Sequence, residues 1–197
     1  MTRVVRYLTH PQVNIDPAVP VPEWGLSDLG RSRTDALAQS GVLSGTQTII
    51  SSAEAKAVET AAILAQSLNA THLIRPGMHE NDRSATGFLP GPEFERFADA
   101  FFAQPDISVC GWETASHAQA RIVAETRAAL AETPTGDVLF VGHGGVGTLL
   151  YCHLAGVAIS RAHDQGPGGG GNVITFDPQM GPPAQGWQPM EALFGAA

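Results

Sequence analysis

Short apolar runs alternate along this chain with longer segments that carry an apolar stripe at helical spacing. The short runs predict β-strands at 3–9, 46–51, 71–75, 137–142 and 172–177. The longer segments predict helices at 27–41, 53–68, 116–130 and 146–154. Strands and helices that alternate in this way are typical of an α/β fold, in which helices cover both faces of a mostly parallel sheet.

The boundaries of these elements carry recognisable signals. Ser27 is a good N-cap with Asp28 in the first turn behind it, and Gly41 is a natural stop for the same helix. Three phenylalanines between 94 and 101 recur at helical spacing and predict core or cap packing. The tail beyond 178 is rich in Pro, Gly and Gln, which predicts a surface-wrapping or partly mobile segment. Residues 1–197 are expected to form one domain, with 78–112 inserted as a small cap.

Two of the predicted strands stop at a histidine. His10 follows the first apolar run in the sequence YLTHPQ, and His143 follows another in FVGHGG. In open α/β folds the carboxyl ends of the strands are where ligands bind, so the pair predicts a site there. Gly144 and Gly145 add to this prediction, because backbone without side chains at a helix start can approach an anion closely. The alternative is that each histidine is simply a polar residue closing a strand.

Two further places carry chemistry of the same kind. Ser51 and Ser52 end a strand where a helix begins, and Lys56 adds a cation one turn inside that helix. Glu80 and Asp82 place carboxylates in the loop after the third strand. A single lysine in a helix or a single acid in a loop is ordinarily just a solvated side chain. The order of these residues along the chain is what supports a functional site.

Composition narrows the choice of partner. The formal net charge is -8 and the isoelectric point about 5.2, which argue against a nucleic-acid or anionic-membrane surface but leave room for a local basic pocket. The spacing of Cys110 and Cys152 fits neither a zinc site nor a disulfide scaffold, so we expect a cytoplasmic protein with free thiols. A metal site that adds His79 or His153 to the histidine pair is a weaker alternative, since no HExxH-type spacing is present.

The motifs in this order resemble those of the histidine phosphatases related to cofactor-dependent phosphoglycerate mutase. That family ends its first strand in Arg-His-Gly, which corresponds here to Thr9, His10 and Pro11. Its Ser-Ser, arginine and threonine segment resembles 51–61, its loop glutamate falls on Glu80, and its second histidine motif falls on 138–145. The resemblance spans almost the whole chain and implies a three-layer α/β/α sandwich.

The same resemblance implies a mechanism without a metal or other cofactor. His10 would attack phosphorus to give a phosphohistidine, which water or an acceptor hydroxyl would then break down. His143, Lys56 and backbone N–H groups would stabilise the phosphoryl oxygens, and Glu80 would protonate the leaving oxygen. The residues expected to bind substrate are Thr9, Lys56, Gly144 and Arg83.

At three positions the chain departs from the family pattern in ways that weaken phosphate binding. Family members commonly use two arginines where this chain has Thr9 and Lys56, and Pro11 lacks the N–H of the usual glycine. Losing one preorganised donor costs on the order of 3 to 4 kcal/mol of transition-state stabilisation. If another arginine replaces the missing donor, Arg83 and Arg161 are the candidates. If neither does, substituting arginine for Thr9 is expected to raise turnover.

The leading functional prediction is a weak or narrow phosphomonoesterase acting on a small phosphorylated metabolite. The alternative is a non-catalytic member of the same fold that binds a phospho-ligand or has a regulatory role. A sugar-phosphate mutase comes third, because it must hold a dianionic intermediate and exclude water with a pocket short of cations. The sequence does not identify the substrate or the oligomeric state.

Overall fold

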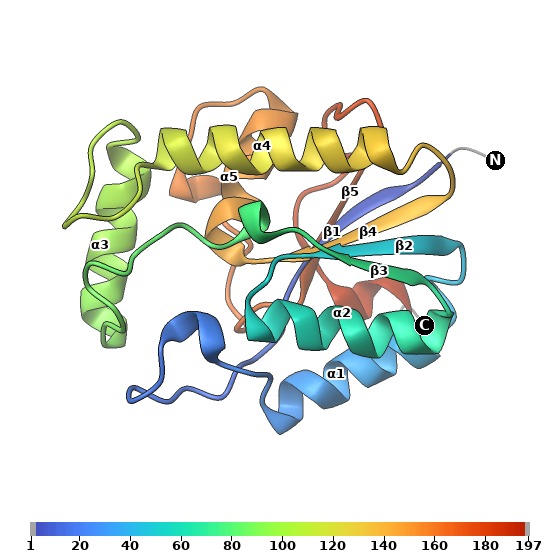
Figure 1. Ribbon diagram of the computed structural model, residues 1–197. Coiled ribbons are helices and arrows are strands. Elements are labelled where there is room, and N and C mark those ends of the chain that lie inside the picture. Colours follow the sequence, from blue (N-terminus) through green and yellow to red (C-terminus); the bar gives the residue numbers. More distant parts are fainter. Residues whose placement is uncertain (1–2, 196–197) are drawn as a thin grey trace.

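The computed structural model describes residues 3–195, which fold around a six-stranded sheet in the order β3-β2-β4-β1-β5-β6 (Figure 1). The strands are β1 (Val5–Thr9), β2 (Thr46–Ser51), β3 (Thr71–Ile74), β4 (Asp137–Gly142), β5 (Asn172–Phe176) and β6 (Gln188–Pro189). The helices are α1 (Asp28–Gln39), α2 (Ala55–Leu68), α3 (Gly91–Ala103), α4 (Ala115–Glu132) and α5 (Gly144–Ala155). Strands β1 to β4 pair in parallel, and β5 and β6 add an antiparallel edge.

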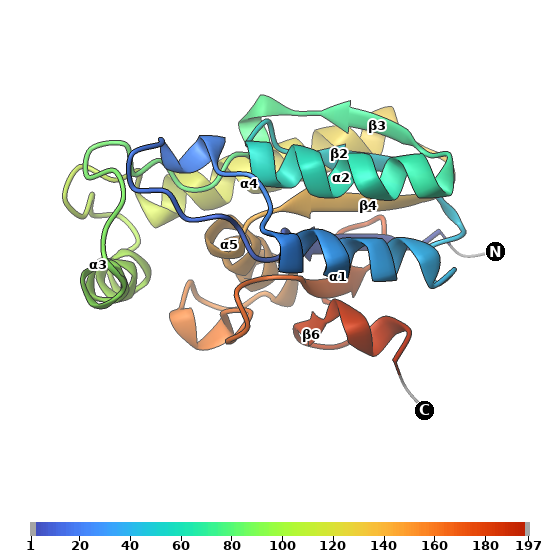
Figure 2. The ribbon, with the colours of Figure 1, turned by 90° about the horizontal axis from the view of Figure 1, so that it is seen from below.

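The sheet separates two apolar cores, which confirms the predicted three-layer sandwich. Figure 2 shows α1 and α2 together on one side of the sheet, while Figure 1 shows α4 and α5 on the other. Successive side chains of a strand point to opposite faces. Accordingly Val138 and Phe140 of β4 pack with α4 and α5, whereas Leu139 and Val141 pack with α1 and α2.

Local signals explain most element boundaries. The Ser27 side chain accepts a hydrogen bond from Gly30 N at 3.2 Å and so caps α1 as predicted. Gly156 ends α5 in the left-handed conformation that glycine adopts without steric cost.

The tail differs from its prediction. Gln188 and Pro189 pair with β5, and Met190, which follows them, is fully buried against the α1–α2 side of the sheet. The composition of this segment does not predict a strand, because the pairing depends on the exposed edge of β5, which exists only once the sheet has formed.

The parallel register brings the carboxyl ends of three strands together. Thr9 of β1 pairs with Gly142 of β4, and Ser51 of β2 pairs with Val141. The residues that follow these strands therefore meet at one end of the sheet. Helix α3 lies beyond this same end (Figure 1), so the 78–112 segment is near the site, and its role as a cap stays a prediction.

Candidate functional site

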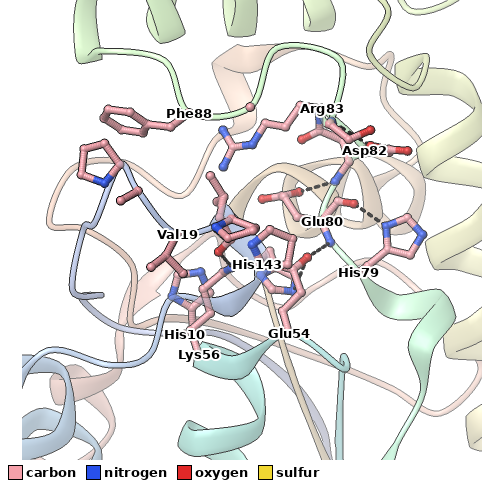
Figure 3. Close-up of a pocket in the computed structure, with 18 residues that line it drawn as sticks. His10, Val19, Glu54, Lys56, His79, Glu80, Asp82, Arg83, Phe88 and His143 are labelled. Carbon is pink, nitrogen blue, oxygen red and sulfur yellow. Dashed lines mark hydrogen bonds and ion pairs between the residues drawn. The ribbon is translucent and has the colours of Figure 1, made fainter.

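A cavity of about 660 Å³ opens at the carboxyl ends of the strands (Figure 3). It is lined by residues that follow β1, β2, β3 and β4 in turn. They are His10 with 17–22, Glu54 with Lys56, the 79–84 segment with Gly87 and Phe88, and His143. Cavities of roughly 300–1,000 Å³ accommodate small-molecule ligands, so this one is large enough for a substrate.

The two predicted histidines face one another. The ring centroids of His10 and His143 are 5.3 Å apart, with the planes at 67°. Backbone pairing fixes this arrangement, since His10 N donates to Gly142 O at 2.9 Å. Both rings are therefore close enough to contact one phosphoryl group.

The His10 ring is held in one orientation. Its Nδ1 lies 2.8 Å from the carbonyl oxygen of Pro11, which can only accept, so Nδ1 carries the hydrogen and Nε2 is the unprotonated nitrogen. Burial is the largest cause that lowers the pKa of His10 to about 3, and the neighbouring His143 and Lys56 contribute in the same direction. The neutral ring is the form that a nucleophile requires.

His143 is fully buried at the start of α5. Its Nε2 is 2.7 Å from Ser52 Oγ, and its backbone N donates to the hydroxyl of Tyr7 at 3.0 Å. Burial lowers the pKa of His143 to about 4; Glu54 opposes this shift, while Lys56 and Arg83 add to it. The other ring nitrogen, Nδ1, is buried and has no hydrogen-bond partner in residues 3–195.

Glu54 is a site residue that the sequence did not reveal. It is buried, forms an ion pair with Lys56, and places Oε1 3.5 Å from His143 Nε2. Burial opposes ionisation, but His143 and Lys56 lower the pKa of Glu54 to about 2. Lys56 lines the cavity, its charge is balanced by this carboxylate, and its role in substrate binding stays a prediction. The only signal was an acid beside Ser51-Ser52 at a strand–helix junction, where exposed acids are also common.

Glu80 lines the cavity and also caps α5. Its Oε2 accepts from Gly145 N and its Oε1 from Val146 N, both at 2.9 Å, and Oε1 also accepts from Asn81 N at 3.0 Å. A carboxylate at a helix N-terminus is favoured by the unpaired N–H groups there. Glu80 is thus fixed in place by its role as an acceptor, and its role as a proton donor stays a prediction.

The predicted phosphate-binding residues separate into two groups. Arg83 lines the cavity and extends into it (Figure 3), with its guanidinium 4.8 Å from the centroid of the Phe94 ring. Arg161 does not line it, because it pairs with Glu95 and Asp99 of α3. Of the two candidate arginines, the structure brings only Arg83 to the site.

Thr9 and Gly144 also lie outside the cavity lining, contrary to the expectation that they contact substrate. The Thr9 hydroxyl donates to Gln165 Oε1 at 2.6 Å and accepts from Asn172 N at 3.0 Å, so it faces the loop before β5. Gln165 is also the neighbour of Gly144, where an added Cβ would lie 2.3 Å from its Nε2. The space beside β1 that an arginine would need is therefore filled.

The fold is shared with solved phosphatase structures. A mycobacterial glucosyl-3-phosphoglycerate phosphatase superposes with a TM-score of 0.74 at 19% identity, covering 95% of this chain and 96% of the other. Phosphoserine phosphatase from Entamoeba histolytica, solved with 3-phosphoglyceric acid, gives 0.69 at 16% identity over 93% and 94%. The mycobacterial enzyme has also been solved with inorganic phosphate and with VO3. No curated protein matched the sequence.

The chain belongs to the histidine phosphatase superfamily (branch 1), whose family model matches residues 18–180. This match covers His143, Lys56 and Glu80, while His10 lies before its start. The superfamily and the structural neighbours are phosphatases. Within residues 3–195, no three His, Cys, Asp or Glu side chains gather as they would around a metal ion, and no helix is long and apolar enough to cross a membrane.

Proposed function

We propose that this protein is a phosphomonoesterase that works through a phosphohistidine on His10. The observation that carries the proposal is the facing pair of neutral imidazoles, with 5.3 Å between ring centroids, at a cavity large enough for a phosphate ester. Membership of the superfamily, and the phosphate and VO3 complexes of the mycobacterial neighbour, support the same chemistry.

In the first step, His10 Nε2 attacks phosphorus in line with the leaving oxygen. The N–P bond forms as the P–O bond breaks, and the leaving oxygen takes a proton to depart as an alcohol. Glu80 is our candidate for that proton transfer. In the second step water attacks phosphorus and gives a proton to the Glu80 carboxylate, the N–P bond breaks, and inorganic phosphate leaves. The hydrogen bond from Nδ1 to Pro11 O keeps the same ring nitrogen free for each turnover.

Stabilisation of the phosphoryl oxygens falls to His143 and Arg83. His143 lines the site, and its Nδ1 is a buried polar atom that has no hydrogen-bond partner among residues 3–195. Arg83 supplies a guanidinium, which grips two oxygens at once in a way that an ammonium does not. In this proposal Arg83 binds the phosphoryl oxygens in place of the arginines that family members commonly have at the positions of Thr9 and Lys56.

One observation favours the second candidate, a phospho-ligand binding protein without turnover. Glu54 balances the charge of Lys56 and lies beside His143, so the site has less positive charge with which to stabilise the transition state of phosphoryl transfer. If this effect dominates, we expect the protein to bind phosphorylated ligands but to hydrolyse them slowly.

A phosphate-release screen against a panel of phosphomonoesters tests the proposal. The wild-type protein should release phosphate from at least one ester, and His10→Ala should reduce this by three orders of magnitude or more, roughly the loss found when a nucleophile is removed. His153→Ala, on an exposed position of α5, is the matched control and should keep full activity. Equal activity of His10→Ala and wild type would refute the mechanism.

A further inference from the structure

The two sides of the cavity differ in chemistry. Figure 3 shows Val19 and Phe88 on one side, and Glu80, His79 and Asp82 on the other. The first side, here called the apolar wall, consists of residues 17–22 and Phe88. The 17–22 segment reads PAVPVP, so none of its side chains can donate or accept a hydrogen bond.

The apolar wall is preformed. Trp24 Nε1 donates to Asp16 O at 2.9 Å and to Val19 O at 3.0 Å, which ties the segment into a fixed loop. Lys56 Nζ donates to Val21 O at 2.8 Å, so the wall is anchored directly to a residue of the phosphoryl site. Prolines restrict the backbone of the same segment. A wall of this kind offers a rigid surface and does not need to order itself when a ligand binds.

Phe88 extends this wall toward solvent. Its ring packs on Trp24 with 5.5 Å between centroids, yet 37% of the residue remains exposed. Single exposed apolar side chains are ordinary on protein surfaces. Phe88 differs because it continues an apolar surface that leads down to His10 within one cavity.

The cavity is much larger than a phosphoryl group, so most of its volume must receive the rest of the substrate. Hydroxyl groups of a sugar would lose water against the apolar wall without gaining partners, which is unfavourable. A flat apolar ring would instead gain from burial against proline, valine and phenylalanine. Glu80 points the same way, since both its oxygens accept backbone N–H groups and an aryl oxide needs less help from a proton donor than an alkoxide does.

We infer that the substrates are phosphomonoesters of aromatic alcohols, with the ring lying against the apolar wall. This rests on the proposed phosphatase function and specifies its substrate class. The wall selects for the leaving group, while the histidines and Arg83 hold the phosphoryl group.

The turnover test compares 1-naphthyl phosphate with glucose 6-phosphate. Phe88→Ala should lower kcat/KM for 1-naphthyl phosphate by roughly tenfold or more, mainly through KM, and change the value for glucose 6-phosphate by less than about twofold. Ile107→Ala, at a 56% exposed position outside the cavity lining, should leave both values unchanged. Because each variant is compared with wild type on the same ester, the intrinsic reactivity of the leaving groups cancels. An equal fall for both esters, or a wild-type preference for glucose 6-phosphate, would overturn the inference.

Binding separates this inference from the proposed function. Naphthylmethylphosphonate and methylphosphonate cannot be hydrolysed, and calorimetry should show the aromatic compound binding at least about tenfold tighter to wild type, with the difference lost in Phe88→Ala. If no ester is turned over, the proposed function fails, and the binding preference alone then decides whether the site takes aromatic ligands. Equal affinities for the two phosphonates would reject the apolar wall as a binding surface.

Discussion

Replacing Glu54 by glutamine should strengthen the binding of inorganic phosphate. The Glu54 carboxylate lies 3.5 Å from His143 Nε2, so an anion bound between the two imidazoles is close to a like charge. At an effective dielectric constant of about 20, two unit charges about 6 Å apart repel by about 3 kcal/mol. Glutamine keeps the shape and removes the charge, so we expect phosphate affinity to rise by up to roughly a hundredfold.

The same substitution should destabilise the unliganded protein. Lys56 is buried and would lose its only carboxylate partner within residues 3–195, although Nζ still donates to Val21 O. Removing one partner of a buried ion pair costs about 3–5 kcal/mol. Phosphate then supplies the missing negative charge, so its stabilising effect on Glu54→Gln should exceed its effect on wild type.

Calorimetry and thermal unfolding with and without phosphate measure both effects. Glu59→Gln is the matched control, because Glu59, which lies in α2, is another ion-paired acid but does not line the cavity. The double variant Glu54→Gln with Lys56→Met removes both buried charges and should fold without the gain in affinity. If Glu54→Gln folds and binds phosphate no tighter than wild type, the electrostatic reasoning is wrong.

Three other predictions concern the rest of the site. Arg83→Ala should weaken phosphate binding by about tenfold or more in calorimetry, whereas Arg161→Ala should leave it unchanged. A loss of affinity in Arg161→Ala but not in Arg83→Ala would identify Arg161 as the phosphate-binding arginine. Gly170→Ala should lose activity and more than about 1 kcal/mol of stability, because φ is +89° and the new Cβ would lie 2.1 Å from His10 O; Gly166→Ala, with φ +83° and open space, should keep activity. The pKa of His10 is about 3 in the folded protein and 6.5 ordinarily. Between pH 3 and 6.5, therefore, His10 binds a proton in the unfolded chain but not in the folded protein, and the free energy of unfolding should fall as the pH drops below about 6.5. Urea unfolding of His10→Asn should show a shallower fall, and an unchanged curve would contradict a neutral His10 ring in the folded protein.

Much of the fold was predictable because apolar periodicity and caps act locally. The strand 46–51 and the cap at Ser27 were predicted correctly, and the parallel sheet followed from the alternation of elements. The histidine pair was also predictable, since parallel strands end at a common edge of the sheet. These features depend on residues close together in sequence or on a general rule of topology.

The rest depended on contacts between distant segments. Glu54 is buried because the β3–α3 loop covers it, and Glu80 N donates to its Oε1 at 2.8 Å. Thr9 faces away from the site because Gln165, far along the chain, accepts its hydroxyl. For the same reason we now expect Thr9→Arg to lower activity, since the guanidinium would displace Gln165 instead of entering an empty space.

Trapping of the phosphorylated protein tests the central claim most directly. Wild-type protein mixed with a hydrolysed ester, quenched within one turnover and analysed by intact mass spectrometry should carry one phosphoryl group, stable in base and labile in acid. Peptide mapping should place it on His10, and His10→Ala should carry none. Steady phosphate release with no phosphoryl group on His10, or with the group on another residue, would contradict the account.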